Sequence, residues 1–84
     1  MYQVYLLRSK KGRSKSYVGL TLKGVENRLK EHNLGKSRYT KSFLPWEIVY
    51  YENFYCQTCA EQREKFLKSG YGFRLRKMIL NNYK

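Results

Sequence analysis

Apolar and polar residues along this chain follow two periods, one typical of strands and one typical of helices. Three runs rich in β-branched and aromatic residues predict strands at residues 2–7, 17–20 and 46–51. The segment 9–16 between the first two runs contains Gly12 and several lysine and arginine residues, which indicates a flexible basic hairpin loop. We therefore expect the first two strands to pair antiparallel.

Helical spacing marks the segment after the second strand. Val25, Leu29 and His32 fall on one face of a helix, because each follows the last by one helical turn. Gly35 comes next and is typical of the position just beyond a helix C-terminus. We expect the basic segment 36–44 that follows to be a loop.

Two further helices are predicted in the last third of the chain. Thr58 and Glu61 match a capping box, in which each side chain satisfies a free backbone amide of the first helical turn. The helix that begins there is expected to reach Lys68 and to end at Ser69 and Gly70. Residues 73–83 predict a final helix, with Leu75, Met78 and Ile79 inward and Arg74, Arg76 and Lys77 outward.

The order of these elements, β-β-α-β-α-α, predicts an α+β fold. We expect a small three-stranded, mostly antiparallel sheet with flanking helices. A chain of 84 residues is expected to form one domain, residues 1–84, with little stability to spare.

Positive charge dominates the composition and narrows the classes of partner. Eighteen lysine and arginine residues stand against six aspartate and glutamate residues, a formal net charge of +12. Such a field is typical of a protein that binds a polyanion, so nucleic acid is the expected partner. A basic ribosome-type surface without chemistry is the alternative.

A membrane is the less favoured partner. Basic residues run from Arg8 to Lys84 instead of gathering on one amphipathic helix. The apolar stretches are only a few residues long, too short for a signal peptide or a membrane span. We therefore expect no membrane association and a cytoplasmic location.

The chain has two cysteines, Cys56 and Cys59, at the spacing of a CxxC motif. A structural zinc site needs four ligands, and His32 is the only further candidate. A redox pair would follow the first strand of a βαβ unit, whereas this pair lies past mid-chain. We interpret the two cysteines as small residues around a helix start.

Glu64 is the first candidate for chemistry. It lies between Ala60 and Leu67 at helical spacing, so its carboxylate is on or beside the apolar face of its helix. A charge in that position is costly unless it is paired or bound to a metal. Either an ion pair with Arg28, Arg63 or a lysine, or a metal ion, would explain it.

Arg28 and His32 are four residues apart and project from the same side of the first helix. The arginine can clamp a phosphate and the histidine can move a proton near neutral pH, although a surface arginine and a partly buried histidine are the alternative. Together with Tyr5, Tyr17 and Glu64 they supply the groups that phosphodiester hydrolysis needs. A single carboxylate suits Mg²⁺, which keeps most of its waters.

These residues lie in motifs that resemble the GIY-YIG nucleases. Gln3-Val4-Tyr5 and Tyr17-Val18-Gly19 are similar to the two tripeptides that name the family, with Gln3 in place of the leading glycine. The segment 28–32 resembles the family's Arg-x-x-x-His helix, and Arg63-Glu64 its metal-binding glutamate. The match runs in order along nearly the whole chain, and segments 36–52 and 63–70 resemble the short stand-alone bacterial, excinuclease C-like branch.

The resemblance implies a role for each group. Tyr5 and Tyr17 would line the site, with Tyr17 near the nucleophile and Tyr5 as its partner. A tyrosine has a pKa of about 10, so a basic role needs a nearby cation such as Arg28 or Lys15. Arg28 would stabilise the phosphorane, His32 would assist proton transfer, and Glu64 would hold a single Mg²⁺ or Mn²⁺.

Other residues would hold the nucleic acid. Gly19 would permit close approach of the backbone to a phosphate. Lys15, Arg38 and Lys41, all in predicted basic loops, are candidates for further contacts.

Three functions follow from these observations. The first is a metal-dependent endonuclease that hydrolyses phosphodiester bonds in DNA, in repair or recombination. The second is a nucleic-acid-binding module of the same fold that does not cleave, or cleaves only with a partner. The third is a small basic RNA- or ribosome-associated protein. Larger members of the family carry targeting modules, so a protein partner is expected to supply targeting; the oligomeric state stays open.

Overall fold

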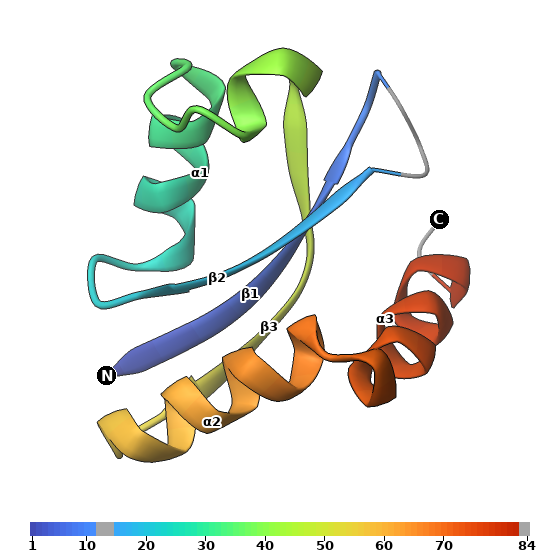
Figure 1. Ribbon diagram of the computed structural model, residues 1–84. Helices are drawn as coiled ribbons and strands as arrows, with labels where there is room; N and C mark the ends of the chain where they lie inside the picture. The colour runs from blue at the N-terminus through green and yellow to red at the C-terminus, as the bar shows by residue number, and fades with distance from the viewer. Residues whose placement is uncertain (12–14, 83–84) are drawn as a thin grey trace.

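An antiparallel sheet of three strands runs through the middle of the molecule (Figure 1). The computed structural model describes residues 1–11 and 15–82. The strands are β1 (Tyr2–Ser9), β2 (Ser16–Thr21) and β3 (Trp46–Phe54), in the order β2-β1-β3. The helices are α1 (Val25–Asn33), the short 3₁₀ helix η1 (Thr40–Phe43), α2 (Gln57–Lys68) and α3 (Gly70–Asn82).

The predicted α+β class and the order β-β-α-β-α-α are confirmed. Both strand pairs are antiparallel, and the 3₁₀ helix is an addition that the expected loop 36–44 did not include. Gly12 and Arg13 of the predicted hairpin loop, and Tyr83 of the predicted final helix, lie outside the described residues.

The central strand β1 is covered on both faces, which explains its continuous apolar run. Val4 and Leu6 belong to a cluster shared with α2 and α3, whereas Tyr5 and Leu7 belong to a cluster shared with α1. Figure 1 shows α1 on one side of the sheet and α2 and α3 on the other. Within the described part of the chain, none of the helices has the length and apolarity needed to cross a bilayer.

The start of α2 differs from the prediction. Cys56 is the N-cap residue, with extended backbone, and its Sγ accepts a hydrogen bond from the Cys59 amide over 3.4 Å. Thr58 is already inside the helix, so the predicted capping box between Thr58 and Glu61 is wrong. The interpretation of the two cysteines as residues around a helix start is confirmed.

The start of α3 also differs, because one serine serves two helices. Ser69 ends α2, and its Oγ accepts a hydrogen bond from the Gly72 amide over 3.3 Å, as an N-cap does. The helix therefore begins at Gly70, three residues before the predicted Phe73.

Only part of the apolar stripe of α3 packs on the sheet. Leu75 and Ile79, one turn apart, contact the cluster around Val4 and Leu6. Met78 lies off that line and is 61% exposed, so its prediction as an inward residue is wrong.

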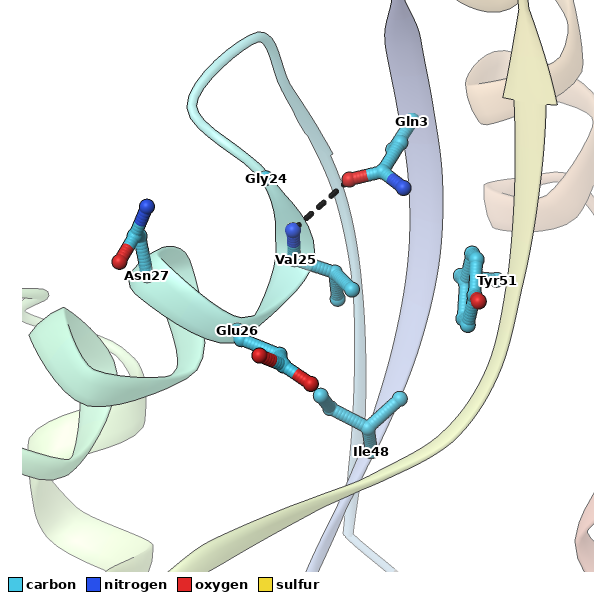
Figure 2. A pocket seen from close by; sticks show the side chains of 7 residues that line it. All are labelled: Gln3, Gly24, Val25, Glu26, Asn27, Ile48 and Tyr51. Carbon is cyan, nitrogen blue, oxygen red and sulfur yellow. Dashed lines mark hydrogen bonds between the residues drawn. The ribbon is translucent and has the colours of Figure 1, made fainter.

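Gln3 joins three elements through its side chain. Its Oε1 accepts a hydrogen bond from the Val25 amide over 2.8 Å, and its Nε2 donates to Asn53 Oδ1 over 2.9 Å. Figure 2 shows this amide beside a pocket that Ile48 and Tyr51 also line. Gly24, at the N-cap position of α1, has no side chain to satisfy the first free amides, so Gln3 satisfies one of them from the neighbouring strand.

Replacing Gln3 with alanine should lower the free energy of unfolding by about 1 kcal/mol, the usual cost of losing a helix-capping hydrogen bond. Urea denaturation measures this change. The exposed Gln62 on α2 provides a matched control, and Gln62→Ala should change the stability by less than about 0.5 kcal/mol. Equal stabilities of Gln3→Ala and the parent would show that the cap is not needed.

Candidate functional site

Tyr5 and Gly19 are directly opposite each other on β1 and β2, on the sheet face that α1 covers. A Cβ atom at Gly19 would lie 2.3 Å from both Cζ and Oη of Tyr5, far inside any allowed contact. The missing side chain therefore lets the Tyr5 phenol lie across β2. The contact with Tyr5 explains why residue 19 is a glycine. The expected approach of phosphate to Gly19 stays a prediction.

A buried row of polar groups begins at the Tyr5 hydroxyl. Tyr5 Oη lies 3.0 Å from His32 Nε2, and His32 Nδ1 lies 2.8 Å from Thr40 Oγ1. All three residues are almost completely buried. Both ring nitrogens of His32 are thus occupied, and the row links β1, α1 and η1.

Thr40 was not identified from the sequence, because it lies in a segment predicted to be a loop and no periodicity points to it. Its backbone oxygen accepts a hydrogen bond from Trp46 Nε1 over 2.7 Å. The amide side chain of Asn33 in turn binds both backbone groups of Trp46, at 2.7 Å and 3.2 Å. These bonds fix the end of α1 and the start of η1 to β3, and so hold His32 in place.

Burial sets the protonation of this row. It raises the pKa of Tyr5 well above its ordinary value, as does Tyr17, while the charge of Arg28 acts in the opposite direction. Burial also lowers the pKa of His32, and Arg28 adds to this effect. Near neutral pH Tyr5 is therefore a phenol and His32 is neutral. Either tautomer of His32 satisfies both neighbours, because a hydroxyl can donate or accept.

The lowered pKa of His32 predicts that stability falls on mild acidification. The unfolded chain takes up a proton near its ordinary pKa of about 6.5, whereas the folded chain does so only at lower pH. The stabilisation is complete above the pKa of His32 in the unfolded chain. It is lost as the pH falls through the lower pKa of His32 in the folded chain. Urea denaturation from about pH 7 to about pH 5.5 should show the loss. His32→Gln should be less stable at neutral pH and lack this slope; an equal slope in both proteins would contradict the assignment.

Tyr17 lies on the same face as Tyr5 and is half-buried, so solvent reaches it. Its ring centroid is 4.9 Å from that of His32 and 6.3 Å from that of Tyr5. Lys68 Nζ lies 5.9 Å from the centre of the Tyr17 ring, and the same atom lies 3.3 Å from Glu64 Oε2. Lys68 thus connects α2 with β2; its spacing of four residues from Glu64 was the signal that could have identified it.

Glu64 forms the ion pair with a lysine that was one of the predicted alternatives. Its side chain is 23% exposed, and its charge is the smallest of the effects that raise the pKa of Tyr5, after burial and Tyr17. Of the two arginines considered, Arg28 pairs with Glu31 and Arg63 with Glu52.

The position of α2, and with it that of Glu64, depends on Glu52. Arg63 donates two hydrogen bonds to the Glu52 carboxylate, at 2.8 Å and 3.0 Å, and the Tyr50 hydroxyl donates a third. Burial alone would raise the pKa of Glu52, but these hydrogen bonds outweigh it and the pKa is lowered. The carboxylate therefore stays ionised and fastens α2 to β3.

Glu64 is the candidate ligand for a metal ion in this cluster. Among residues 1–11 and 15–82, no three His, Cys, Asp or Glu side chains are grouped to hold one. A closed zinc-type site would need such a group. A hard cation such as Mg²⁺ binds through one or two carboxylates and keeps several waters, and Glu64 fits this mode.

Arg28 approaches the two tyrosines from α1. It forms an ion pair with Glu31 and is 31% exposed, and its charge interacts with both Tyr5 and Tyr17. The structure thus brings together the five residues named from the sequence, from β1, β2, α1 and α2. They are Tyr5, Tyr17, Arg28, His32 and Glu64.

The three basic residues expected to contact nucleic acid are all exposed. Lys15 is exposed, with Nζ 5.2 Å from the centre of the Phe43 ring. Arg38 and Lys41 are exposed and flank in sequence the pair Tyr39 and Thr40, whose side chains join the cluster.

Comparison with known proteins agrees with this geometry. The model of the GIY-YIG catalytic domain matches residues 1–78. A UPF0213 protein of Natronomonas pharaonis is 41% identical over 54 residues, which are 63% of this chain and 62% of that protein. A UPF0213 protein of Haloquadratum walsbyi is 39% identical over 54 residues, 63% of this chain and 60% of that protein. This chain thus spans less than two thirds of the length of these curated relatives.

The family match extends from β1 into α3 and includes all the elements that form the cluster. The matched model is that of a catalytic domain. The resemblance seen in the two tyrosine tripeptides, the Arg-x-x-x-His helix and the later glutamate is therefore confirmed: this chain belongs to the GIY-YIG family.

Proposed function

We propose that this protein is an endonuclease that hydrolyses phosphodiester bonds in DNA with one Mg²⁺ or Mn²⁺ held by Glu64. The observation that carries the proposal is the convergence of groups on the Tyr5 hydroxyl. That hydroxyl lies 3.0 Å from His32 Nε2, and its pKa responds to Tyr17, Arg28 and Glu64. These residues supply a carboxylate, a guanidinium and two phenols, which are groups that phosphoryl chemistry requires.

The difference in burial between the two tyrosines separates their roles. Tyr5 is 1% exposed and its pKa is raised by burial, so it stays protonated and out of reach of substrate. Tyr17 is half-buried and open to solvent, with the Lys68 ammonium near its ring. We therefore propose that Tyr17 contacts the nucleophilic water and that Tyr5 positions Tyr17 and His32.

The remaining residues neutralise charge and hold the two phenols in position. Arg28, half-buried beside both phenols, neutralises charge that develops on the phosphoryl oxygens. His32 has no exposed surface and does not meet substrate directly; it holds the Tyr5 hydroxyl, which lies 3.0 Å from its Nε2, and its ring lies beside that of Tyr17. When bound, the divalent ion supplies Lewis-acid stabilisation of the phosphoryl group.

DNA repair or recombination is the proposed setting, with a protein partner that selects the site of cleavage. The net charge of +12 supports binding to the phosphate backbone but carries no sequence preference.

A second candidate is a nucleic-acid-binding module of the same fold that does not cleave by itself. One observation favours it: the Glu64 carboxylate already has a partner, because Lys68 Nζ lies 3.3 Å away. Glu64 can therefore be explained by its ion pair without a metal ion.

Cleavage of labelled substrates tests the two candidates. The panel contains single-stranded and double-stranded DNA and RNA, each with Mg²⁺, with Mn²⁺ or with chelator. We expect cleavage of DNA that needs the metal and stops in chelator. Tight binding without cleavage under any condition would favour the second candidate, and cleavage of RNA alone would contradict DNA as the substrate.

A further inference from the structure

A row of aromatic rings leads from the candidate site along η1. The Tyr39 ring centroid is 5.9 Å from that of Tyr17 and 6.2 Å from that of Phe43. The three rings come from β2, from the residue before η1 and from η1 itself. The site and the segment that was predicted to be a plain basic loop thus form one continuous surface.

Tyr39 is the exposed member of this row, with 51% of its surface accessible. The neighbouring Thr40 is completely buried, and it binds His32 through its side chain and Trp46 through its backbone oxygen. The backbone next to Tyr39 is therefore fixed while its ring stays open to solvent. A ring held in this way loses little conformational entropy when a ligand stacks on it.

Packing alone does not explain the exposed ring. Phe43 and Tyr17 are half-buried and pack against the core cluster of Leu7 and Trp46, whereas Tyr39 stands outside that cluster. An exposed tyrosine contributes little to the stability of the core. Its ring, beside that of Tyr17, is therefore accessible to a ligand.

Cations accompany the rings at both ends. Lys15 Nζ lies 5.2 Å from the centre of the Phe43 ring, and Lys68 Nζ lies 5.9 Å from that of Tyr17. Aromatic rings for the bases and cations for the phosphates form the surface that binds a single strand. Within a continuous duplex, each base face is covered by its neighbours, so a base reaches such a ring only after it has left the stack.

We propose that Tyr39 and Phe43 form a stacking platform for an unpaired base next to the cleaved bond. The substrate is then a nucleic acid with unpaired bases at the cleavage point, not a continuous duplex. The cleavage part of this inference rests on the proposed nuclease function, whereas the stacking part does not.

Binding in chelator tests the platform without cleavage. The probes are a single-stranded DNA oligonucleotide containing 2-aminopurine and the fully paired duplex of the same sequence. Tyr39→Ala should weaken binding of the single strand by about 5- to 150-fold, the usual effect of losing one base–aromatic stack, and should remove the quenching of 2-aminopurine. Duplex binding should change less than about twofold.

Three variants separate stacking from other effects. Tyr39→Phe keeps the ring and should bind like the parent, whereas Tyr39→Leu keeps apolar bulk without a π face and should fail like Tyr39→Ala. Tyr71→Ala removes a tyrosine that is 87% exposed on α3, and it should leave both probes unaffected. Unchanged single-strand binding by Tyr39→Ala, or an equal loss on both probes, would overturn the platform.

A cleavage assay with Mg²⁺ on the same probes distinguishes the two proposals. Quenching that depends on Tyr39, without cleavage of either probe, would support the stacking platform and contradict the proposed nuclease function. Cleavage of duplex and single strand at equal rates, unaffected by Tyr39→Ala, would support the nuclease function and contradict the stacking platform.

Discussion

Replacing Glu64 with glutamine should abolish metal-dependent cleavage and leave binding of DNA unchanged or tighter. The carboxylate is the group proposed to hold the divalent ion, and Lewis-acid stabilisation of a phosphoryl group contributes several kcal/mol to the transition state. Since about 1.4 kcal/mol corresponds to a tenfold change in rate, the loss should be about a hundredfold or more. Binding should not suffer, because the change removes a negative charge that faces phosphate and releases the Lys68 ammonium 3.3 Å away.

The Glu64→Gln protein should fold. The pair with Lys68 is at the surface, with side chains 23% and 50% exposed, and such pairs contribute about 0–1 kcal/mol to stability. Glu61→Gln is the matched control, since it makes the same change of charge at an exposed position one turn earlier on α2. Initial cleavage rates and DNA-binding curves for the parent, Glu64→Gln and Glu61→Gln test this prediction. If Glu64→Gln cleaves at the parental rate, the metal ligand lies elsewhere.

Replacing Gly19 with alanine should damage both stability and activity. The added Cβ would lie 2.3 Å from Tyr5 Oη and Cζ, so the phenol must move away from β2 and from its contact with His32 Nε2. Overpacking of a core site costs about 1–3 kcal/mol. For a domain of this size each kcal/mol lowers the melting temperature by about 4–8 °C, which a thermal melt resolves.

Two comparisons show whether the Tyr5 ring causes the loss. Gly70→Ala adds the same methyl group where no atom lies within 4 Å apart from its chain neighbours and the backbone of its own helix, and it should be neutral or slightly stabilising. In a Tyr5→Ala background the cost of Gly19→Ala should vanish, because the atoms that it meets are gone. A cost that persists in that background would place the clash elsewhere.

The local elements of this fold could be predicted because strands and helices have their own periods in the sequence. The apolar run of β1, the face shared by Val25, Leu29 and His32, and the left-handed Gly35 after α1 all agree with the structure. Each of these features involves residues within a few positions of one another, where backbone geometry alone decides which side chains share a face.

Some residues of the candidate site could also be predicted from the sequence. Arg28 and His32 share a side of α1 through their spacing, and Glu64 stands out as a charge between Ala60 and Leu67. Spacing could not decide between an ion pair and a metal ion for Glu64, nor could it show that burial keeps His32 neutral. Both depend on what surrounds the group, which one helix does not reveal.

Contacts between distant residues were decided by the tertiary structure alone. Strand register places Gly19 under the Tyr5 ring, and the path of η1 brings Thr40 to His32. The cap of α1 comes from Gln3, on a different element. The periods of a sequence report which face of its own element a residue lies on. They do not report which element that face meets, because this depends on how the whole chain packs.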